Sequence, residues 1–228
     1  MKNKLIKRAF LDTLPVMSGY IVLGIGFGIV LEKNGYGVWW ALLMSTLIYA
    51  GSMQYAGIEL LVSAASLPAV ALTTLMVNAR HLFYGISMID KYKNAGIKKP
   101  YMIFALTDET YSLVCSEKYE NEKDRHFYFF IVSLFDQIYW VTGSVAGSLI
   151  GSAIPFDTNG IEFSMTALFV TVFVEQWLST KNHASAVLGL VASALCLVIF
   201  GQDSFLIPSM VIILVSLTLM RGKVKDYE

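Results

Sequence analysis

Residues 68–89 read PAVALTTLMVNARHLFYGISMI. A helix that crosses a bilayer needs about 20 mostly apolar residues, and this run is long enough. It also contains Asn78, Arg80 and His81, which are costly in lipid; a central Arg costs roughly 2.5–3.5 kcal/mol on insertion scales. Groups of this kind are retained in membrane helices where they have a partner or a function. The stretch therefore predicts a membrane-spanning helix that carries a polar site.

The composition of the whole chain indicates that lipid is its solvent. The 228 residues are 56% hydrophobic and only 15% charged, with a mean hydropathy of +0.60. A soluble domain averages nearer about 25% charged residues. The net charge of zero gives no support for a nucleic-acid partner. The sequence has no histidine pair at i, i+4, cysteine cluster, nucleophile elbow or phosphate-binding loop, so we expect neither an enzyme nor a metal or cofactor site.

Further apolar runs predict an all-α, polytopic membrane protein with seven or eight transmembrane helices. We expect residues 1–228 to form a single transporter domain, with a basic N-terminal tail at 1–9 and a polar C-terminal tail at 221–228. A short segment, Tyr101–Cys115, is interrupted by polar residues and is either a marginal span or a re-entrant one. The seven firm spans are Phe10–Leu31, Val38–Val62, Pro68–Ile89, Phe127–Gly151, Glu162–Ser179, Ala184–Phe200 and Phe205–Met220.

The basic residues between the spans do not decide between the two counts. Eight spans place both termini inside but leave the basic Lys91–Lys99 loop outside, against the positive-inside rule. Seven spans, with Tyr101–Cys115 not crossing, keep that loop inside but place the basic N-terminus outside. Each topology breaks the rule once, so both remain open.

Glycine residues predict where the helices break and pack. Gly51 and Gly57 bracket a polar patch in the second run, which predicts a broken or unwound section. Small residues four apart allow helices to approach closely, and they recur at Gly24/Gly28 and at Gly143/Gly147/Gly151.

The chain also has a possible internal repeat. Asn34-Gly35 precedes a helix that ends near Gln54, and Asn159-Gly160 precedes one that ends near Gln176. Transporters are often built from such repeats, with the binding site near the midplane where helices break.

Arg80 and its neighbours are the first candidates for a binding or proton-coupling site. Arg80 can act as a fixed cation that holds an anionic group, while the imidazole of His81 can exchange protons near neutral pH. Asn78 shares a helix face with His81, three residues on. The structural alternative is an Arg whose charge snorkels to the interface.

Two further groups could complete that site. Asp108 and Glu109 supply a counter-charge, either as an ion pair with Arg80 that locks helices together or as carriers of a coupling proton or a substrate ammonium. Ser52, Gln54 and Tyr55 lie in the glycine-bracketed patch, where exposed backbone could bind a zwitterion. The alternative for this patch is a kink packed against a neighbour.

Four other polar residues in the apolar runs are weaker candidates. An interfacial position explains Glu175 and Gln176 well. Asp136 and Gln137 lie nine residues into their run and are harder to explain in this way.

Four stretches of this sequence resemble the AzlC family of bacterial inner-membrane proteins, the large subunits of branched-chain amino acid exporters. They are Pro15–Gly28, Tyr49–Ala56, Asn78–Gly85 and Thr107–Tyr111, and the resemblance extends from about Ala9 to Met220. It implies export of valine, leucine, isoleucine or analogues such as methionine or azaleucine. It also implies a small AzlD-like membrane subunit as partner and a location in the bacterial cytoplasmic membrane.

The residues and the resemblance together predict a binding site between Ser52–Gln54, Asn78–His81 and Asp108–Glu109. Because the sequence has no nucleotide-binding feature, we expect the proton motive force to drive transport. The alternative function is a non-transporting scaffold subunit that stabilises a partner, which the small-residue faces would also suit.

Overall fold

The computed structural model describes residues 2–115, 122–153 and 183–201, together with separate positions between 170 and 178 and between 205 and 219. Every regular element in these parts of the chain is helical. The chain divides into two compact units, residues 1–166 and 167–228. The expected spans Glu162–Ser179 and Phe205–Met220 are described only at separate positions, and Asn159-Gly160 lies outside the described residues.

Two long helices form the frame of the first unit. The helices α1 (Lys2–Lys33) and α7 (Glu122–Ala153) each have 32 residues, and both are long and apolar enough to cross a membrane. At 1.5 Å per residue each extends about 48 Å, beyond the roughly 30 Å hydrocarbon core. They contain the predicted spans Phe10–Leu31 and Phe127–Gly151. The helix α1 also includes the basic residues from Lys2 onward, because residues 2–9 contain no Pro or Gly, and it continues through Pro15.

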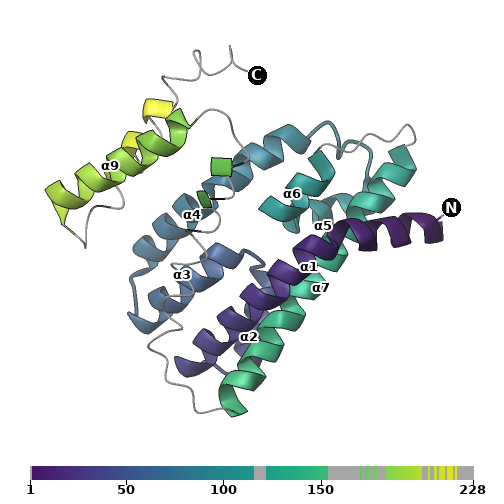
Figure 1. Cartoon of the computed structure of the whole chain (residues 1–228), viewed down its shortest axis with the longest axis horizontal. Coiled ribbons are helices and arrows are strands. Elements are labelled where there is room, and N and C mark those ends of the chain that lie inside the picture. The colour runs from purple at the N-terminus through teal and green to yellow at the C-terminus, as the bar shows by residue number, and fades with distance from the viewer. Residues whose placement is uncertain are drawn as a thin grey trace. The chain divides into compact units, whose positions relative to one another are not determined.

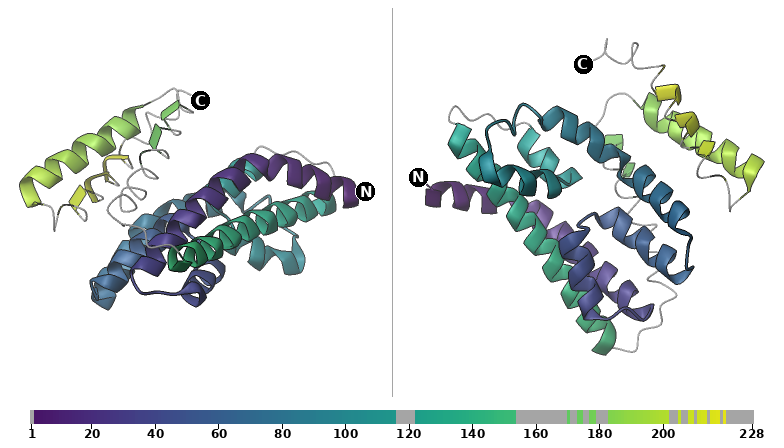
Figure 2. Two further views of the ribbon diagram at one scale, coloured as in Figure 1. Left: turned by 60° about the horizontal axis from the view of Figure 1, so that its bottom comes forward. Right: turned by 180° about the vertical axis from the view of Figure 1, so that it is seen from behind.

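Small residues bring α1 and α7 into backbone contact along their length (Figures 1 and 2). A Cβ atom added at Gly24 would lie 2.9 Å from the backbone N of Ser144, and one at Gly143 would lie 2.8 Å from the backbone O of Ile21. Real side chains do not approach this closely, so only glycine fits. The predicted close approach at both glycine faces is confirmed, and the two faces pack on each other.

The second predicted span is a broken helix, as expected, but the break lies earlier than predicted. The helix α2 (Val38–Leu47) ends at Leu47, and α3 (Gly51–Val62) begins at Gly51. Residues 48–50 therefore form the break, and the segment Gly51–Gly57 is helical. Tyr49 has φ 44°, a left-handed conformation that cannot continue a helix. Gly51 serves packing instead, because an added Cβ would lie 3.0 Å from the Trp140 ring.

The helix α4 (Leu67–Met88) contains the stretch quoted first, with Pro68 in its first turn, where its missing N–H is tolerated. A 3₁₀ turn (Gly96–Lys98) leads into α5 (Lys99–Phe104) and α6 (Asp108–Cys115). The predicted interruption of Tyr101–Cys115 is confirmed, but the break lies at residues 105–107. Of the interrupting polar residues 107–110, only Thr107 lies in it. With six and eight residues, neither helix is long enough to cross a bilayer alone.

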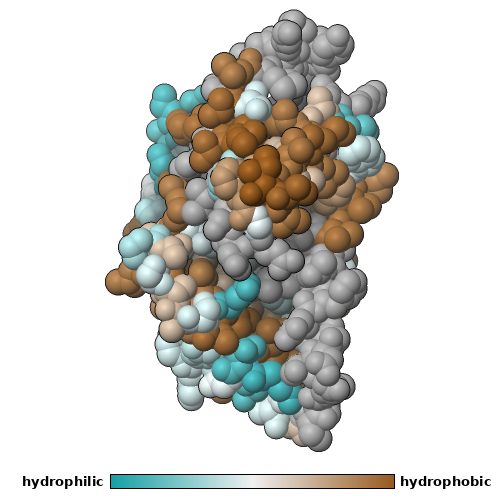
Figure 3. All heavy atoms as spheres, turned by 90° about the vertical axis from the view of Figure 1, so that its left-hand side faces the viewer, coloured by the Kyte–Doolittle hydropathy of each residue, from teal (hydrophilic) through white to brown (hydrophobic). Residues whose placement is uncertain are grey.

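The second unit contains α9 (Ala184–Phe200), which has the predicted bounds and bears no charged residue. Most of its large side chains are exposed, with Val198 at 84%. Exposed apolar residues also occur on α1, α2 and α4. Figure 3 shows hydrophobic side chains gathered over part of one face. Surfaces of this kind are stable against lipid tails rather than water.

Candidate functional site

Two helix breaks in the first unit lie beside one cavity. The cavity measures about 490 Å³, and its wall includes both the break at 48–50 and the end of α5 with Leu106. This size falls in the range of roughly 300–1,000 Å³ that is usual for small-molecule sites. Backbone N–H and C=O groups in a break are not all used by helical hydrogen bonds, so they can serve a ligand. The complete lining is Ile48, Tyr49, Ala50, Asn78, His81, Gly85, Met88, Ile89, Tyr92, Lys99, Ile103, Phe104 and Leu106.

Asn78 and His81 supply the polar part of the cavity wall contributed by α4. The Nδ1 atom of His81 lies 3.2 Å from the backbone O of Asn78, which fixes the ring against its own helix. The side-chain oxygen of Asn78 is buried and has no hydrogen-bond partner among the described residues. An unpaired buried acceptor is costly, so a shift of this side chain that brings the oxygen to a donor would be favourable.

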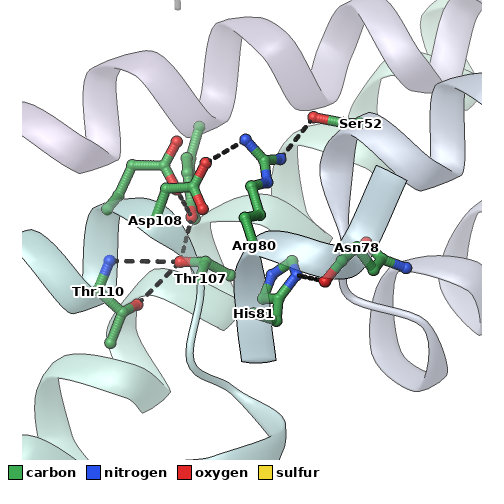
Figure 4. Close-up of polar contacts among 9 residues, drawn as sticks. Ser52, Asn78, Arg80, His81, Thr107, Asp108 and Thr110 are labelled. Atoms are coloured by element: carbon green, nitrogen blue, oxygen red, sulfur yellow. Dashed lines mark hydrogen bonds and ion pairs between the residues drawn. The ribbon is translucent and has the colours of Figure 1, made fainter. Parts of the chain in front are cut away.

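Arg80 lies outside the cavity wall and joins three helices. Its guanidinium forms an ion pair with Asp108 at the start of α6, and its Nη2 donates a hydrogen bond of 2.9 Å to Ser52 Oγ on α3. Figure 4 shows Arg80 extending toward these two residues, while Asn78 and His81 lie together apart from it. Of the residues predicted from the sequence, Ser52, Arg80 and Asp108 are therefore in direct contact, and Asn78 and His81 form a separate pair.

Glu109 takes part in a different set of contacts from its neighbour Asp108. Its Oε2 accepts a hydrogen bond of 2.6 Å from the hydroxyl of Tyr20 on α1. Tyr20 also lies 2.7 Å from Thr107 Oγ1, in the break before α6. The two consecutive carboxylates thus connect α6 to α4 and to α1.

Asp136 is fully buried on α7 and accepts a hydrogen bond of 2.7 Å from Thr110 Oγ1. Gln137 accepts one of 2.7 Å from the hydroxyl of Tyr101 and donates one of 3.2 Å to the backbone O of Thr46. Gln137 therefore links α7 to α5 and α2, which is a structural role. The other weaker candidates, Glu175 and Gln176, lie outside the described residues.

Gln54 and Tyr55 face the interior rather than the cavity. The indole nitrogen of Trp140 donates a hydrogen bond of 2.9 Å to Gln54 Oε1, and Tyr55 donates one of 2.7 Å to the backbone O of Leu23. Both residues lie within the helix α3, so the prediction of unwound backbone at Ser52–Gln54 is wrong. The unwound residues 48–50 are just before them because the left-handed turn at Tyr49, rather than Gly51, ends the previous helix.

Three polar residues of these networks were not predicted from the sequence: Tyr20, Thr107 and Thr110. Each had a signal, since Tyr20 is a hydroxyl in the middle of an apolar run and the two threonines flank the acidic pair three residues apart. Within the parts of the chain that the structure describes, no three His, Cys, Asp or Glu side chains are grouped to hold a metal ion.

Comparisons with known proteins identify relatives along almost the whole chain. The sequence profile described as AzlC protein matches residues 15–154. The branched-chain amino acid transport protein AzlC of Bacillus subtilis is 41% identical over 222 residues, covering 97% of this chain and 87% of that protein. A membrane protein of Helicobacter pylori is 42% identical and covers 97% of each chain.

A more distant relative is the inner membrane protein YgaZ of Escherichia coli, 26% identical over 86% of this chain and 81% of that protein. No solved structure matches this chain. The apolar helices and the relatives agree that this is a bacterial inner-membrane protein. The profile match and the 41% identity over nearly the full length show that the chain belongs to the AzlC family.

Proposed function

We propose that this chain exports branched-chain amino acids such as valine, leucine and isoleucine, driven by the proton motive force and together with a small AzlD-like subunit. The observation that carries the proposal is the cavity between two helix breaks. Binding sites in transporters commonly lie where helices are broken, because free backbone groups there can replace the water of a polar ligand. The printed name of the Bacillus subtilis relative supports the class of substrate.

The cavity has the mixed character that an amino acid with an apolar side chain requires. The backbone of residues 48–50 and the side chains of Asn78 and His81 can bind the ammonium and carboxylate groups. Apolar residues form most of the remaining wall, namely Met88, Ile89, Ile103, Phe104 and Leu106. Packing against such a wall discriminates only about 1–3 kcal/mol per methylene, so we expect broad selectivity among branched and thioether side chains.

In this proposal Arg80 acts through Asp108 rather than on the substrate. Its guanidinium already has Asp108 and Ser52 as partners, and it does not line the cavity. It therefore holds α3, α4 and α6 together beside the cavity. A change in that ion pair would move the two breaks relative to each other, which is a route by which the site could open and close.

The scaffold alternative loses its main support. It rested on small-residue faces that could hold a partner, but Gly24 and Gly28 pack on α7 of the same chain. Gly143 and Gly147 are covered in the same contact, so neither face is free for another protein.

Reconstitution in liposomes tests the proposal. The full chain is reconstituted with and without an AzlD-like subunit, and uptake of labelled leucine is followed under an imposed pH gradient. We expect leucine movement that follows the gradient and needs no ATP. Dependence on ATP would overturn the coupling, and absence of leucine movement in both preparations would overturn the function. Full activity of the chain alone would remove the need for the partner.

A further inference from the structure

A continuous series of hydrogen bonds connects the buried carboxyl group of Asp136 with the partly buried one of Glu109 in the first unit. It runs from Asp136 Oδ2 to Thr110 Oγ1 at 2.7 Å, and from there to Thr107 Oγ1 at 3.1 Å. It continues to the Tyr20 hydroxyl at 2.7 Å and ends at Glu109 Oε2 at 2.6 Å. These lengths are in or just above the usual range of about 2.5–3.0 Å for O–H···O bonds.

This series of hydrogen bonds is shielded from solvent except at its Glu109 end, where the residue is only partly buried. Asp136 and Thr110 are fully buried, and Tyr20 and Thr107 are 5% and 8% exposed. Its members come from α1, α6, α7 and the break before α6, so only the folded unit assembles it. The sequence pattern by itself does not relate Glu109 to Asp136.

Counting protons along the chain gives its ionisation state. Four links join the two carboxyls, but the three hydroxyls supply only three protons. With both carboxyls ionised, one of the four oxygen–oxygen contacts has no proton, so its two oxygen atoms face each other without a hydrogen bond. With both protonated, five protons compete for four links. A single shared proton is the state in which all four hydrogen bonds form and no acid hydrogen is left outside them. A second proton would have to sit on an outer carboxyl oxygen, and Oδ1 of Asp136 is buried with no hydrogen-bond partner among the described residues.

We propose that Glu109 and Asp136 share one proton through Tyr20, Thr107 and Thr110, and that this is the proton coupled to amino acid export. The coupling role rests on the proposed function, whereas the shared proton rests on the geometry alone. The inference names three hydroxyl residues as positioning residues of a proton path that runs beside the Arg80–Asp108 pair.

The transfer is balanced by a concerted shift along the chain. When Asp136 holds the proton, it donates to Thr110, which donates to Thr107, then to Tyr20 and finally to the Glu109 carboxylate. Each hydroxyl gains one proton and releases one, so the net change moves one proton from Asp136 to Glu109. Asp136 becomes the carboxylate, and every hydroxyl reverses the direction of its hydrogen bond.

The other ionisable groups around the pair leave this proton to the two carboxyls. Glu109 is faced by Asp108 of its own helix and by Arg80 of α4, which form an ion pair with each other. The remaining neighbours are phenols: Tyr20 and Tyr49 interact with both carboxyls, Tyr84 with Glu109, and Tyr101 and Tyr139 with Asp136.

Infrared spectroscopy of the full chain in lipid at neutral pH tests the shared proton without transport. We expect a carboxylic acid C=O band that disappears in both Glu109→Gln and Asp136→Asn, because either amide can donate the fourth hydrogen itself. Tyr20→Phe should shift the band. Glu32→Gln should leave it unchanged, because the Glu32 carboxylate bonds to Ser148 and takes no part in this series of hydrogen bonds. Absence of the band in the wild type, or its survival in either of the two amide variants, would overturn the sharing.

Transport measurements then test the coupling. Tyr20→Phe should lower gradient-driven leucine uptake relative to leucine counterflow by about tenfold or more. Tyr128→Phe is the matched control, since this buried phenol donates to Asp12 instead, at 2.6 Å, and should keep the wild-type ratio. Thr110→Val against Thr13→Val repeats the comparison if Tyr20→Phe does not fold. If the ratio of gradient-driven uptake to counterflow is unchanged in both Tyr20→Phe and Thr110→Val, the coupling is overturned. If the wild type shows no counterflow, the proposed function is refuted, and the infrared result then concerns the shared proton alone.

Discussion

Arg80 contacts two helices besides its own, Ser52 on α3 and Asp108 on α6. The pair is partly shielded, with 32% of the Arg80 side chain and 24% of the Asp108 side chain exposed. Removing one member of a buried pair leaves the other charge uncompensated, which costs about 3–5 kcal/mol when burial is complete. Here the remaining exposure reduces that cost, so the helices can still form without the pair.

Arg80→Gln should therefore reduce leucine export by about tenfold or more while the protein still inserts in the membrane. The physical reason is that Asp108 loses its counter-charge and α6 is no longer fixed to α3 and α4. Export and membrane content are measured together in cells. Lys33→Gln, a basic residue at the end of α1, controls for the loss of a positive charge. Unchanged export with Arg80→Gln would contradict the role of the ion pair.

Asn78→Ala tests the cavity at the same scale. Asn78 lines the cavity, and its amide oxygen has no hydrogen-bond partner among the described residues. Hydrogen bonds to charged groups contribute about 1.5–3 kcal/mol, so loss of the one to a substrate ammonium should weaken leucine affinity by about tenfold or more. Competition of unlabelled leucine in the counterflow assay measures this. Asn34→Ala, at an exposed amide on the loop after α1, should bind leucine as the wild type does.

The sequence indicated which side chains are polar and intramembrane, and it indicated one pair that meets, but not how the others are distributed. The pairing of Arg80 with Asp108 follows from charge, because each is the natural counter-ion of the other in lipid. The separation of Arg80 from His81 and Asn78 depends on the side of α4 that each side chain occupies. Which helix covers each side is a tertiary property that helical spacing does not give.

At the scale of elements, the contact between α1 and α7 depends on glycine. A Cβ added at Gly28 would collide with the backbone of Ser144 and Ser148, whereas one added at Gly19 on the same helix would meet nothing within 4 Å. Overpacking of a close contact costs typically about 1–3 kcal/mol. Alanine is otherwise the better helix former, by about 1 kcal/mol.

Gly28→Ala should accordingly lower the thermal unfolding temperature of the protein in detergent, and Gly19→Ala should maintain or raise it. The difference between the two variants isolates the contact, because the change in helix propensity is the same in both. Equal unfolding temperatures would show that the two helices do not pack through this face.

The element boundaries show what a sequence pattern can and cannot give. The predicted spans at Phe10–Leu31, Pro68–Ile89, Phe127–Gly151 and Ala184–Phe200 are helices, because long apolar runs have no other stable form in lipid. The position of the break near Gly51 could not be predicted from glycine alone. Gly51 is needed for the approach of Trp140, and Tyr49 makes the turn, which only the packed structure distinguishes.

At the scale of the molecule, the first unit combines a rigid frame with a discontinuous part. The helices α1 and α7 are continuous and packed through glycine, while α2–α3 and α5–α6 are interrupted beside the cavity. The polar network of Tyr20, Glu109 and Asp136 connects the frame to the interrupted part. An all-helical membrane fold with a broken helix was predictable from composition and period, and the distribution of those roles was not.

The central claim is that the cavity beside the two breaks binds branched-chain amino acids. The most direct test is counterflow of labelled leucine in liposomes that contain the full chain and an AzlD-like subunit, with no gradient imposed. We expect valine, isoleucine and methionine to compete with leucine to a similar degree, and Asn78→Ala to weaken the binding of all of them together. Absence of counterflow in the wild type, or competition that Asn78→Ala leaves unchanged, would contradict it.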